Sequence, residues 1–472
     1  MQRRTFLKNT SLLGAGLISS KLSFASAPEF PIVRIASSKR HFKSKSVDTA
    51  IKMFSKKVKN PELTWLFENC FPNTLDTTVY YSEKAGKPDT YVITGDIDAM
   101  WLRDSSAQVW PYLQFVNEDA PLKDLIKGVI NHQTKCILKD PYANAFYGDV
   151  NKVGEWTTDK TAMLPGVHER KWEIDSLCYP IRLAYNYYKK TNDRSPFDES
   201  WKKAIETTLK VFKEQQRKTS LGPYHFQRQT TQPTDSLPMA GYGFPVNPVG
   251  LICSAFRPSD DATIFPFLIP SNFFAVVSLN QAAELVKILF NDAQLEKELL
   301  TLAREVESAI QKYGIVTHEK YGKIYAFEVD GFGSSYMMDD ANVPSLLSLP
   351  YLDAISPEDE IYKNTRRFVL STDNPYFFKG TAGEGIGGPH VGQDMIWPMS
   401  ITMRALTSKN DDEIRWCIES LRKTHGGTGF MHESFHKDDP TNFSRKWFAW
   451  SNTLFGELLW KTYNEKPQLL SI

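Results

Sequence analysis

Amphipathic segments recur along almost the whole chain, and short loops that contain Gly, Pro, Asn or Asp separate them. Within each segment the apolar residues return at spacings of three and four, which is typical of helices that bury one face. These segments are 47–59, 105–117, 122–138, 174–191, 197–217, 272–290, 294–314, 359–370, 391–406, 412–424 and 451–463, while 90–94 and 323–329 are strand-like. The pattern predicts a mainly α architecture, and the lack of a fixed sequence repeat argues against a solenoid.

Length and charge narrow the range of functions. A chain of 472 residues without a linker-like segment fits one large domain or two fused ones. We expect the main domain at 46–472, preceded by an irregular segment at 28–45. Lys and Arg number 56 and Asp and Glu 55, so the net charge is +1. This balance provides no basic surface for a nucleic acid or an anionic membrane, and neither is an expected partner.

The N-terminus has the order of an export signal. Arg3 and Arg4 are followed by Thr-Phe-Leu-Lys, then by an apolar run at 11–19 and by Ala-Ser-Ala at 25–27. The order resembles a twin-arginine signal, and the apolar run is too short to span a bilayer. We therefore predict a signal at 1–27 that is cleaved after Ala27, and a periplasmic or exported protein. No Cys follows the run, so a lipid anchor is not expected; the alternative is a helical terminus with a chance arginine pair.

The cysteines do not indicate a structural framework. There are five, Cys70, Cys136, Cys178, Cys253 and Cys417, which are widely spaced and include no CxxC pair. An odd number without metal-ligand spacing predicts neither a disulfide framework nor a zinc site.

Polar residues gather in loops that lead into predicted helices. The stretch TGDIDAMWLRDSSAQVWPY contains Trp101, Arg103 and Asp104, and GGPHVGQDMIWP contains His390. The stretch GGTGFMHESFHKDDPTNFSRKWFAWSN contains Glu433 and Arg445. Polar clusters at loop-to-helix junctions are typical of functional sites on a helical scaffold.

Two adjacent acids, Asp260 and Asp261, lie in SAFRPSDDATIFPFLIPSN between an Arg-Pro turn and an apolar stretch. One interpretation is a charge pair at the first turn of a surface helix, where acids are favoured. The other is catalytic, because an acid beside apolar groups and a second carboxylate has its pKa raised and can serve as a proton donor.

Other chemistries fit the sequence less well. HESFH resembles a zincin motif, but the flanking Gly run and Asp-Asp-Pro argue against the helix on which its two histidines would share a face. Neither a GxSxG nucleophile elbow nor a phosphate-binding loop occurs in the sequence. Carboxylates remain the best candidates for catalysis.

Four stretches together resemble glycoside hydrolase family 125, the bacterial exo-α-1,6-mannosidases: TGDIDAMWLRDSSAQVWPY, SAFRPSDDATIFPFLIPSN, KIYAFEVDG with MMDDANVPSLLSLPY, and GGTGFMHESFHKDDPTNFSRKWFAW. The resemblance runs from about Phe54 to the last helix. It implies an (α/α)6 toroid over 46–472 with short β pieces in loops, hydrolysis without a metal or cofactor, and inversion at the anomeric carbon. It also implies that an aspartate of RPSDD is the general acid, with Asp261 favoured over Asp260, and that Glu433 is the general base.

Inverting hydrolysis needs one protonated carboxyl at the leaving oxygen and one carboxylate that activates water, about 6.5–9.5 Å apart. We expect Arg257 to keep the other aspartate of the pair, the one that is not the acid, ionised. Sugar hydroxyls and the sugar ring are expected to contact Trp101, Arg103, Asp104, His390, Arg257 and Arg445. The alternative for Arg103 and Asp104 is a local ion pair without a role in binding.

The leading hypothesis is a monomeric exo-acting enzyme that removes terminal α-1,6-linked mannose from mannose-containing glycans. Two alternatives stay open. One is an inverting α-glucosidase-like hydrolase on the same toroid, and the other is a catalytically silent carbohydrate-binding protein.

Overall fold

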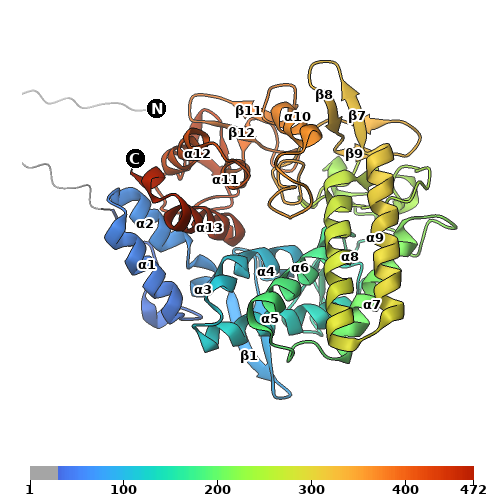
Figure 1. Ribbon diagram of the computed structural model, residues 1–472, viewed down its shortest axis with the longest axis horizontal. Helices are drawn as coiled ribbons and strands as arrows, with labels where there is room; N and C mark the ends of the chain where they lie inside the picture. Colours follow the sequence, from blue (N-terminus) through green and yellow to red (C-terminus); the bar gives the residue numbers. More distant parts are fainter. Residues whose placement is uncertain (1–29, 472) are drawn as a thin grey trace, which may run out of the picture. The chain divides into compact units, whose positions relative to one another are not determined.

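Helices alternate between inner and outer positions around a ring (Figure 1). The structure, a computed structural model, describes residues 30–471, and Ile32–Ile472 form one unit. The predicted export signal at 1–27 lies outside the described residues. All statements below concern the unit that begins at Ile32.

The inner positions are occupied by largely buried helices, most of which contact the next one along the chain. Helix α4 packs on α6, α6 on α8 and α11 on α13, and α13 returns to α4 and closes the ring. The inner helices are α4 (Leu102–Val109), α6 (Ile174–Thr191), α8 (Ile269–Phe290), α11 (Pro398–Leu406) and α13 (Ala449–Glu465).

A turn-rich segment, 342–353, takes the inner position between α8 and α11. Helix α6 holds it from one side, where the Tyr179 hydroxyl donates to the Val343 carbonyl at 2.9 Å and Arg182 donates to the Tyr351 carbonyl at 3.1 Å. The Tyr351 hydroxyl donates in turn to Glu457 on α13, at 2.9 Å. This segment therefore completes the ring without forming a regular helix.

The outer helices cover this ring. Helix α5 packs on α6, α9 on α8 and α12 on α11, while α2 packs on α13, so that the N-terminal helices pair with the C-terminal one. The outer helices are α1 (Lys45–Lys57), α2 (Pro61–Cys70), α5 (Ala120–Lys139), α7 (Glu199–Gln215), α9 (Ala293–Tyr313), α10 (Glu360–Val369) and α12 (Asp411–Lys423). This arrangement is the (α/α)6 toroid, and the expected fold class is confirmed.

Inner and outer helices begin in different ways. Each outer helix starts at a residue whose side chain accepts a backbone N–H of the first turn, and these residues are Ser44, Asn60, Asp119, Asp198, Asp292, Asp359 and Asn410. Such capping contributes about 0.5–2 kcal/mol per helix. In the described structure the inner helices start without a side-chain cap, after Trp101, Glu173, Leu268, Trp397 and Phe448. The N-terminal ends of the inner helices thus keep backbone donors and the positive end of the helix dipole for other partners.

Short strands fix the loops that lead into the inner helices. The sheet β3-β4-β5 ends at the start of α4, β10-β9-β6 at the start of α8, and β13-β14-β15 at the start of α11. Their strands are β3 (Met100–Trp101), β4 (Ala145–Phe146), β5 (Val167–Glu169), β6 (Phe267–Leu268), β9 (Glu328–Val329), β10 (Ser335–Tyr336), β13 (Met395–Ile396), β14 (Ser434–His436) and β15 (Asp439–Ser444). Three hairpins lie elsewhere, formed by β1 (Val79–Lys84) with β2 (Lys87–Val92), β7 (Ile315–His318) with β8 (Gly322–Tyr325), and β11 (Phe377–Lys379) with β12 (Glu384–Ile386).

Most predicted helices are present with small shifts of their ends, but the helix predicted at 391–406 begins only at Pro398. Proline suits the first turn of a helix, and the preceding residues form a loop in which Gly392 has a φ of +88°. The helix predicted at 105–117 divides into α4 and the 3₁₀ turn η2 (Trp110–Phe115), which contains Pro111. Helix α2 and the short α3 (Asn73–Thr77) were not predicted.

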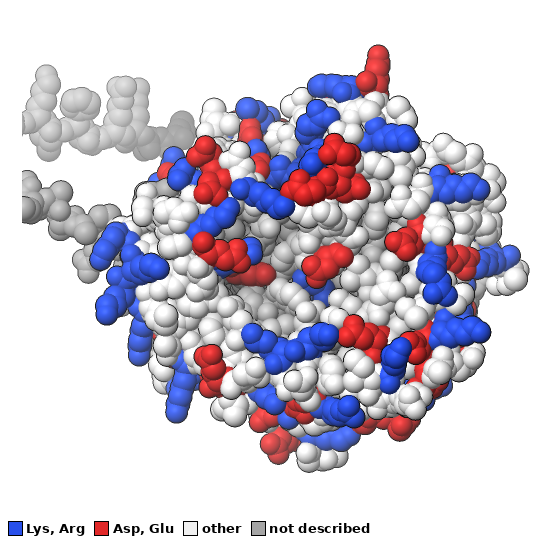
Figure 2. Space-filling view, viewed as in Figure 1, with Lys and Arg blue, Asp and Glu red and all other residues white. Residues whose placement is uncertain are grey.

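Helix α8 is the one helix among residues 30–471 that is long and apolar enough to cross a membrane. Here it packs between α6 and α9, which explains its apolar composition on most sides. Acidic and basic side chains alternate over the face shown in Figure 2, as expected for a chain with a net charge of +1.

Candidate active site

The N-terminal ends of the inner helices meet at one cavity of about 450 Å³. Because the inner helices point the same end toward it, each contributes residues from its first turn or from the loop before it. The cavity is lined by Thr94, Trp101, Arg103, Asp104, Trp156, His168, Lys171, Arg228, Asp260, Asp261, Asn342, His390, Trp397, Glu433, Arg445 and Trp450, among others.

The acid pair lies in a tight turn before β6, not in a helix. The Asp260 N–H donates to the Arg257 carbonyl at 2.9 Å, and the Arg257 N–H donates to the Asp261 carbonyl at 2.7 Å. Asp260 has a φ of +68°, in the left-handed region. The interpretation as a helix-capping charge pair is therefore wrong, and the turn gives the two carboxylates different partners.

Asp260 faces a cationic environment. Its Oδ1 accepts from Arg103 Nη2 at 3.2 Å and from Asn144 Nδ2 at 3.3 Å, and its carbonyl accepts from Lys171 Nζ at 2.9 Å. Burial opposes ionisation of this carboxyl, but Arg103 and Lys171 outweigh burial and hold the pKa of Asp260 well below its usual range. Asp260 is therefore ionised.

The expected role of Arg257 needs correction. Its side chain is buried and its Nε lies 2.6 Å from Glu328 Oε1, an acceptor on β9. Arg257 is not among the residues that line the cavity, so it is not placed to bind a sugar. Arg103 and Lys171, from α4 and from the segment before α6, hold Asp260 in its place.

Asp261 has a different partner, His390. The distance from His390 Nδ1 to Asp261 Oδ1 is 3.3 Å, and Asp261 Oδ2 is buried without a hydrogen-bond partner within residues 30–471. The sequence predicted that the acid faces the apolar stretch after Ala262. In the structure Asp261 instead contacts the imidazole of His390, from the loop before β13. Burial lowers the pKa of His390, but Asp261, Glu433 and Asp260 outweigh burial and raise it to about 9.

Glu433 enters the cavity from the other side of the ring, just before β14. Its Oε2 accepts from the Ser444 hydroxyl at 2.8 Å, and its Oε1 lies 3.3 Å from Arg445 Nη1. Arg445 also pairs with Asp96 at 2.6 Å, which ties the loops before α4 and α13 together. Since HESFH forms loop and strand, His432 and His436 do not share a helical face, and the zincin interpretation is wrong.

The Arg103–Asp104 ion pair exists, with Nε and Oδ2 3.6 Å apart, but it is part of a larger network. Arg103 Nη1 also contacts Glu173 Oε2 at 2.6 Å and Asp175 Oδ2 at 3.1 Å, at the start of α6. Burial raises the pKa of Asp104 to about 6, although Arg103 lowers it. Arg103 therefore has more partners than the local-pair alternative allows.

Several cavity residues were not predicted from the sequence. These are Trp156, Lys171, Arg228, Asn342 and Trp397. Glu173, which contacts Arg103 but does not itself line the cavity, was not predicted either. The run Arg-Lys-Trp-Glu-Ile-Asp at 170–175 places charges directly before a predicted helix, the same signal that identified Arg103. The others come from loops without such a pattern.

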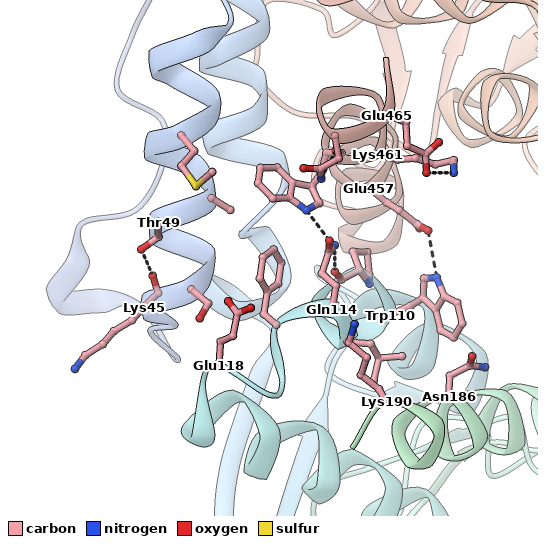
Figure 3. A pocket seen from close by; sticks show the side chains of 18 residues that line it. Lys45, Thr49, Trp110, Gln114, Glu118, Asn186, Lys190, Glu457, Lys461 and Glu465 are labelled. Carbon is pink, nitrogen blue, oxygen red and sulfur yellow. Dashed lines mark hydrogen bonds and ion pairs between the residues drawn. The ribbon is translucent and has the colours of Figure 1, made fainter. Parts of the chain in front are cut away.

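A larger cavity of about 940 Å³ lies between α1, η2, α6 and α13 (Figure 3). Several of its polar groups are paired with one another: Trp460 Nε1 donates to Gln114, Trp110 Nε1 donates to Glu457, and Lys461 contacts Glu465. We place the chemistry in the smaller cavity, where carboxylates from distant elements converge.

Comparison with known proteins agrees with this placement. Residues 60–460 match the family of metal-independent alpha-mannosidases (GH125). The chain belongs to glycoside hydrolase family 125. The matched range includes every carboxylate of the smaller cavity. The family consists of alpha-mannosidases, so the chain is a glycoside hydrolase of this type.

Three proteins of known sequence or structure resemble the chain over most of its length. A metal-independent alpha-mannosidase from Streptococcus pneumoniae, solved in a non-productive complex with alpha-1,6-mannobiose, is 42% identical with a TM-score of 0.86, covering 90% of this chain and 99% of that chain. The meiotically up-regulated gene 157 protein of Schizosaccharomyces pombe is 43% identical over 458 residues, which is 93% of this chain and 90% of the relative. A bacterial glucoamylase solved with acarbose is 13% identical with a TM-score of 0.50, covering 79% of this chain and 51% of that chain, and shares the fold alone.

Proposed function

We propose that this alpha-mannosidase is exo-acting, removes terminal α-1,6-linked mannose from glycans, and inverts the anomeric centre. Asp261 acts as the general acid and Glu433 as the general base. The linkage is suggested by the Streptococcus pneumoniae relative, which was solved with alpha-1,6-mannobiose. A single cavity of about 450 Å³ suits a terminal sugar and its neighbour better than a long chain lying across the ring.

The position of the two carboxylates around the ring is the observation that carries the proposal. Asp261 lies in the turn before β6 and α8, whereas Glu433 directly precedes β14 in the segment between α12 and α13, so the two carboxylates reach the cavity from different parts of the ring. Both side chains line the same cavity. A sugar held between them presents one face to each acid, as inversion requires.

In the proposed reaction Glu433 takes a proton from a water molecule that attacks the anomeric carbon. Arg445 and Ser444 fix the Glu433 carboxylate from behind through the contacts given above. Asp261 gives a proton to the glycosidic oxygen as its bond to the anomeric carbon breaks. Asp260, held ionised by Arg103 and Lys171, supplies a negative charge beside the developing oxocarbenium ion.

Binding groups for hydroxyls are present around the carboxylates. Trp101 and Trp397 line the cavity, and their indole N–H groups are buried without a hydrogen-bond partner among residues 30–471. Buried donors of this kind are rare unless a ligand or water accepts from them. Sugar hydroxyls are suitable acceptors, and the faces of Trp101 and Trp450 provide apolar surface for the ring.

The test uses purified protein with α-1,6-, α-1,3- and α-1,2-mannobiose and with isomaltose, the α-1,6-linked glucose disaccharide. We expect cleavage of α-1,6-mannobiose above the others, with β-mannose as the first product seen by proton NMR. Faster cleavage of isomaltose would favour the glucosidase alternative. Binding of mannobiose without turnover would favour the carbohydrate-binding alternative, and α-mannose as first product would exclude inversion.

We also propose export, from the order of regions at the N-terminus alone. Mass spectrometry of protein from the periplasm or medium is expected to give an N-terminus at Pro28. Exported protein that still begins at Met1 would contradict cleavage.

A further inference from the structure

The contact between His390 and Asp261 joins elements that are 129 positions apart in the sequence. His390 lies in the loop between β12 and β13, and its side chain is 35% exposed toward the cavity. Nδ1 faces Asp261 Oδ1, while Nε2 has no hydrogen-bond partner among the described residues. The imidazole therefore connects the buried carboxyl to the open space of the cavity.

The charges around His390 are mostly negative. Asp261 and Asp260 approach from the turn before β6, and Glu433 from the loop before β14. The loop of His390 also packs on Asp340, since a Cβ at Gly388 would meet Asp340 Oδ2 at 3.0 Å. Arg257 also interacts with Asp261 and Asp340, but its Nε is paired with Glu328.

The carboxylates around His390 favour the positively charged form of its imidazole, and this keeps a proton close to Asp261. Such strongly interacting groups lose their protons as a pair, not as separate residues. Consistent with this geometry, the pKa of His390 is raised to about 9 by Asp261, Glu433 and Asp260 against the effect of burial. In the state with one shared proton, the imidazolium form and the neutral-carboxyl form differ only by transfer between Nδ1 and Oδ1.

We propose that His390 is a positioning residue that holds the catalytic proton together with Asp261, so that the acid of this hydrolase stays loaded at neutral and mildly alkaline pH. This inference rests on the proposed function, in which Asp261 is the general acid. It differs from the role first expected for His390, which was a contact with the sugar.

In the acid step the proton moves first from His390 to Asp261. The Nδ1–H bond breaks and an O–H bond forms on Asp261, which leaves a neutral imidazole and a neutral carboxyl. The carboxyl then gives its proton to the glycosidic oxygen as the bond to the anomeric carbon breaks, and Glu433 receives a proton from the attacking water. After product release Glu433 returns one proton to solvent and the pair takes one from solvent, through the exposed side of His390.

The first experiment is the pH dependence of kcat/KM for His390→Asn and His390→Gln on α-1,6-mannobiose. The wild type is expected to keep its activity up to about pH 9, where the pair loses its last proton. In the variants the alkaline limb is expected to move to lower pH, toward a lone carboxyl, with a loss of roughly 10²-fold or more at pH 8 relative to pH 5. A dinitrophenyl α-mannoside, whose leaving group needs no proton, is expected to restore most of the loss.

His168→Asn is the matched control, because His168 also lines the cavity but donates to or accepts from Tyr147 at 2.8 Å instead of a carboxylate. Its alkaline limb is expected to stay where the wild type has it. Variants of His390 that lose activity equally at all pH values, with the alkaline limb unmoved, would overturn the proposal and leave a structural role.

A second readout does not depend on turnover. NMR titration of the histidine side chains in the free protein is expected to show His390 titrating near pH 9 in the wild type and closer to 6.5 in Asp261→Asn. A wild-type midpoint near 6.5 would overturn the pairing even if the enzyme cleaves mannobiose. If mannobiose is not cleaved but the midpoint is near 9, the proposed function fails while the pair is supported.

Discussion

Arg103 and Glu173 are both buried at the starts of adjacent inner helices, and Arg103 Nη1 lies 2.6 Å from Glu173 Oε2. The same guanidinium contacts Asp175 and Asp260, so one cation neutralises several carboxylates beside the cavity. Burial raises the pKa of Glu173 well above its usual range although Arg103 lowers it, so that a proton on Glu173 relieves part of the negative charge. Arg103 therefore serves two purposes: it joins the starts of two inner helices, and it keeps Asp260 ionised.

Replacement of Arg103 by Met is expected to destabilise the protein by about 3–5 kcal/mol, because buried carboxylates would lose their cation. Chemical denaturation at pH 7 measures the free energy of unfolding. Lys218→Met is the control, since Lys218 belongs to an exposed pair with Glu305 and its loss is expected to cost less than about 1 kcal/mol. Equal effects of the two substitutions would show that the Arg103 network does not stabilise the fold.

Replacement of Glu433 by Gln is expected to lower kcat by about 10²- to 10⁴-fold, because an amide cannot take a proton from water. Binding is expected to persist, since the amide oxygen still accepts from Ser444. Calorimetry with α-1,6-mannobiose and steady-state kinetics separate the two quantities. The surface variant Glu358→Gln provides the matched control, and a Glu433→Gln enzyme with wild-type kcat would remove the base assignment.

Asp261→Asn and Asp260→Asn are expected to differ in their dependence on the leaving group. Loss of a proton donor matters most for a sugar leaving group, so Asp261→Asn should recover on a dinitrophenyl α-mannoside. Asp260→Asn is expected to be impaired on both substrates, because it removes a carboxylate that Arg103 and Lys171 keep ionised. Rate ratios for the two substrates check this, and a recovery seen only at Asp260 would exchange the two roles.

His432, next to Glu433, is expected to make the fold sensitive to acid. Its ring stacks on Phe443 with centroids 3.6 Å apart, and burial lowers its pKa to about 4 although backbone acceptors raise it. Between about pH 6.5 and 4 the unfolded chain binds the proton and the folded one does not, so stability is lost as pH falls through this range, by up to about 3 kcal/mol.

The comparison is with His432→Phe, which keeps an aromatic ring but does not titrate. The unfolding free energy of the wild type minus that of the variant is expected to fall as pH falls from 6.5 to 4 and to be constant above pH 7. A difference that does not change with pH would mean that His432 titrates alike in the folded and unfolded protein.

The sequence predicts the outer helices better than the inner ones. Ser44, Asp119 and Asp292 precede amphipathic segments and accept first-turn N–H groups in the structure, so local chemistry marks where these helices begin. The inner helices start after residues such as Trp101 and Leu268 without side-chain caps. Their starts are set by the short sheets and by the cavity, which pattern and propensity do not encode.

Several candidate site residues could be named from the sequence because they stand in polar loops before helices. Asp261, Glu433, His390 and Arg445 all line the cavity. Arg257 was misplaced because an Arg three positions before an aspartate in sequence need not face it, and the turn directs its side chain to Glu328 instead.

The sequence by itself determined a mainly α chain, the ends of most capped helices and a set of acids that could catalyse hydrolysis. Only the tertiary structure decided which acid carries which charge. The partners that decide it are distant in sequence, with Arg103 157 positions from Asp260 and His390 129 positions from Asp261. Closure of the ring brings these residues together in a buried site, where water no longer screens them and the nearest charge controls protonation.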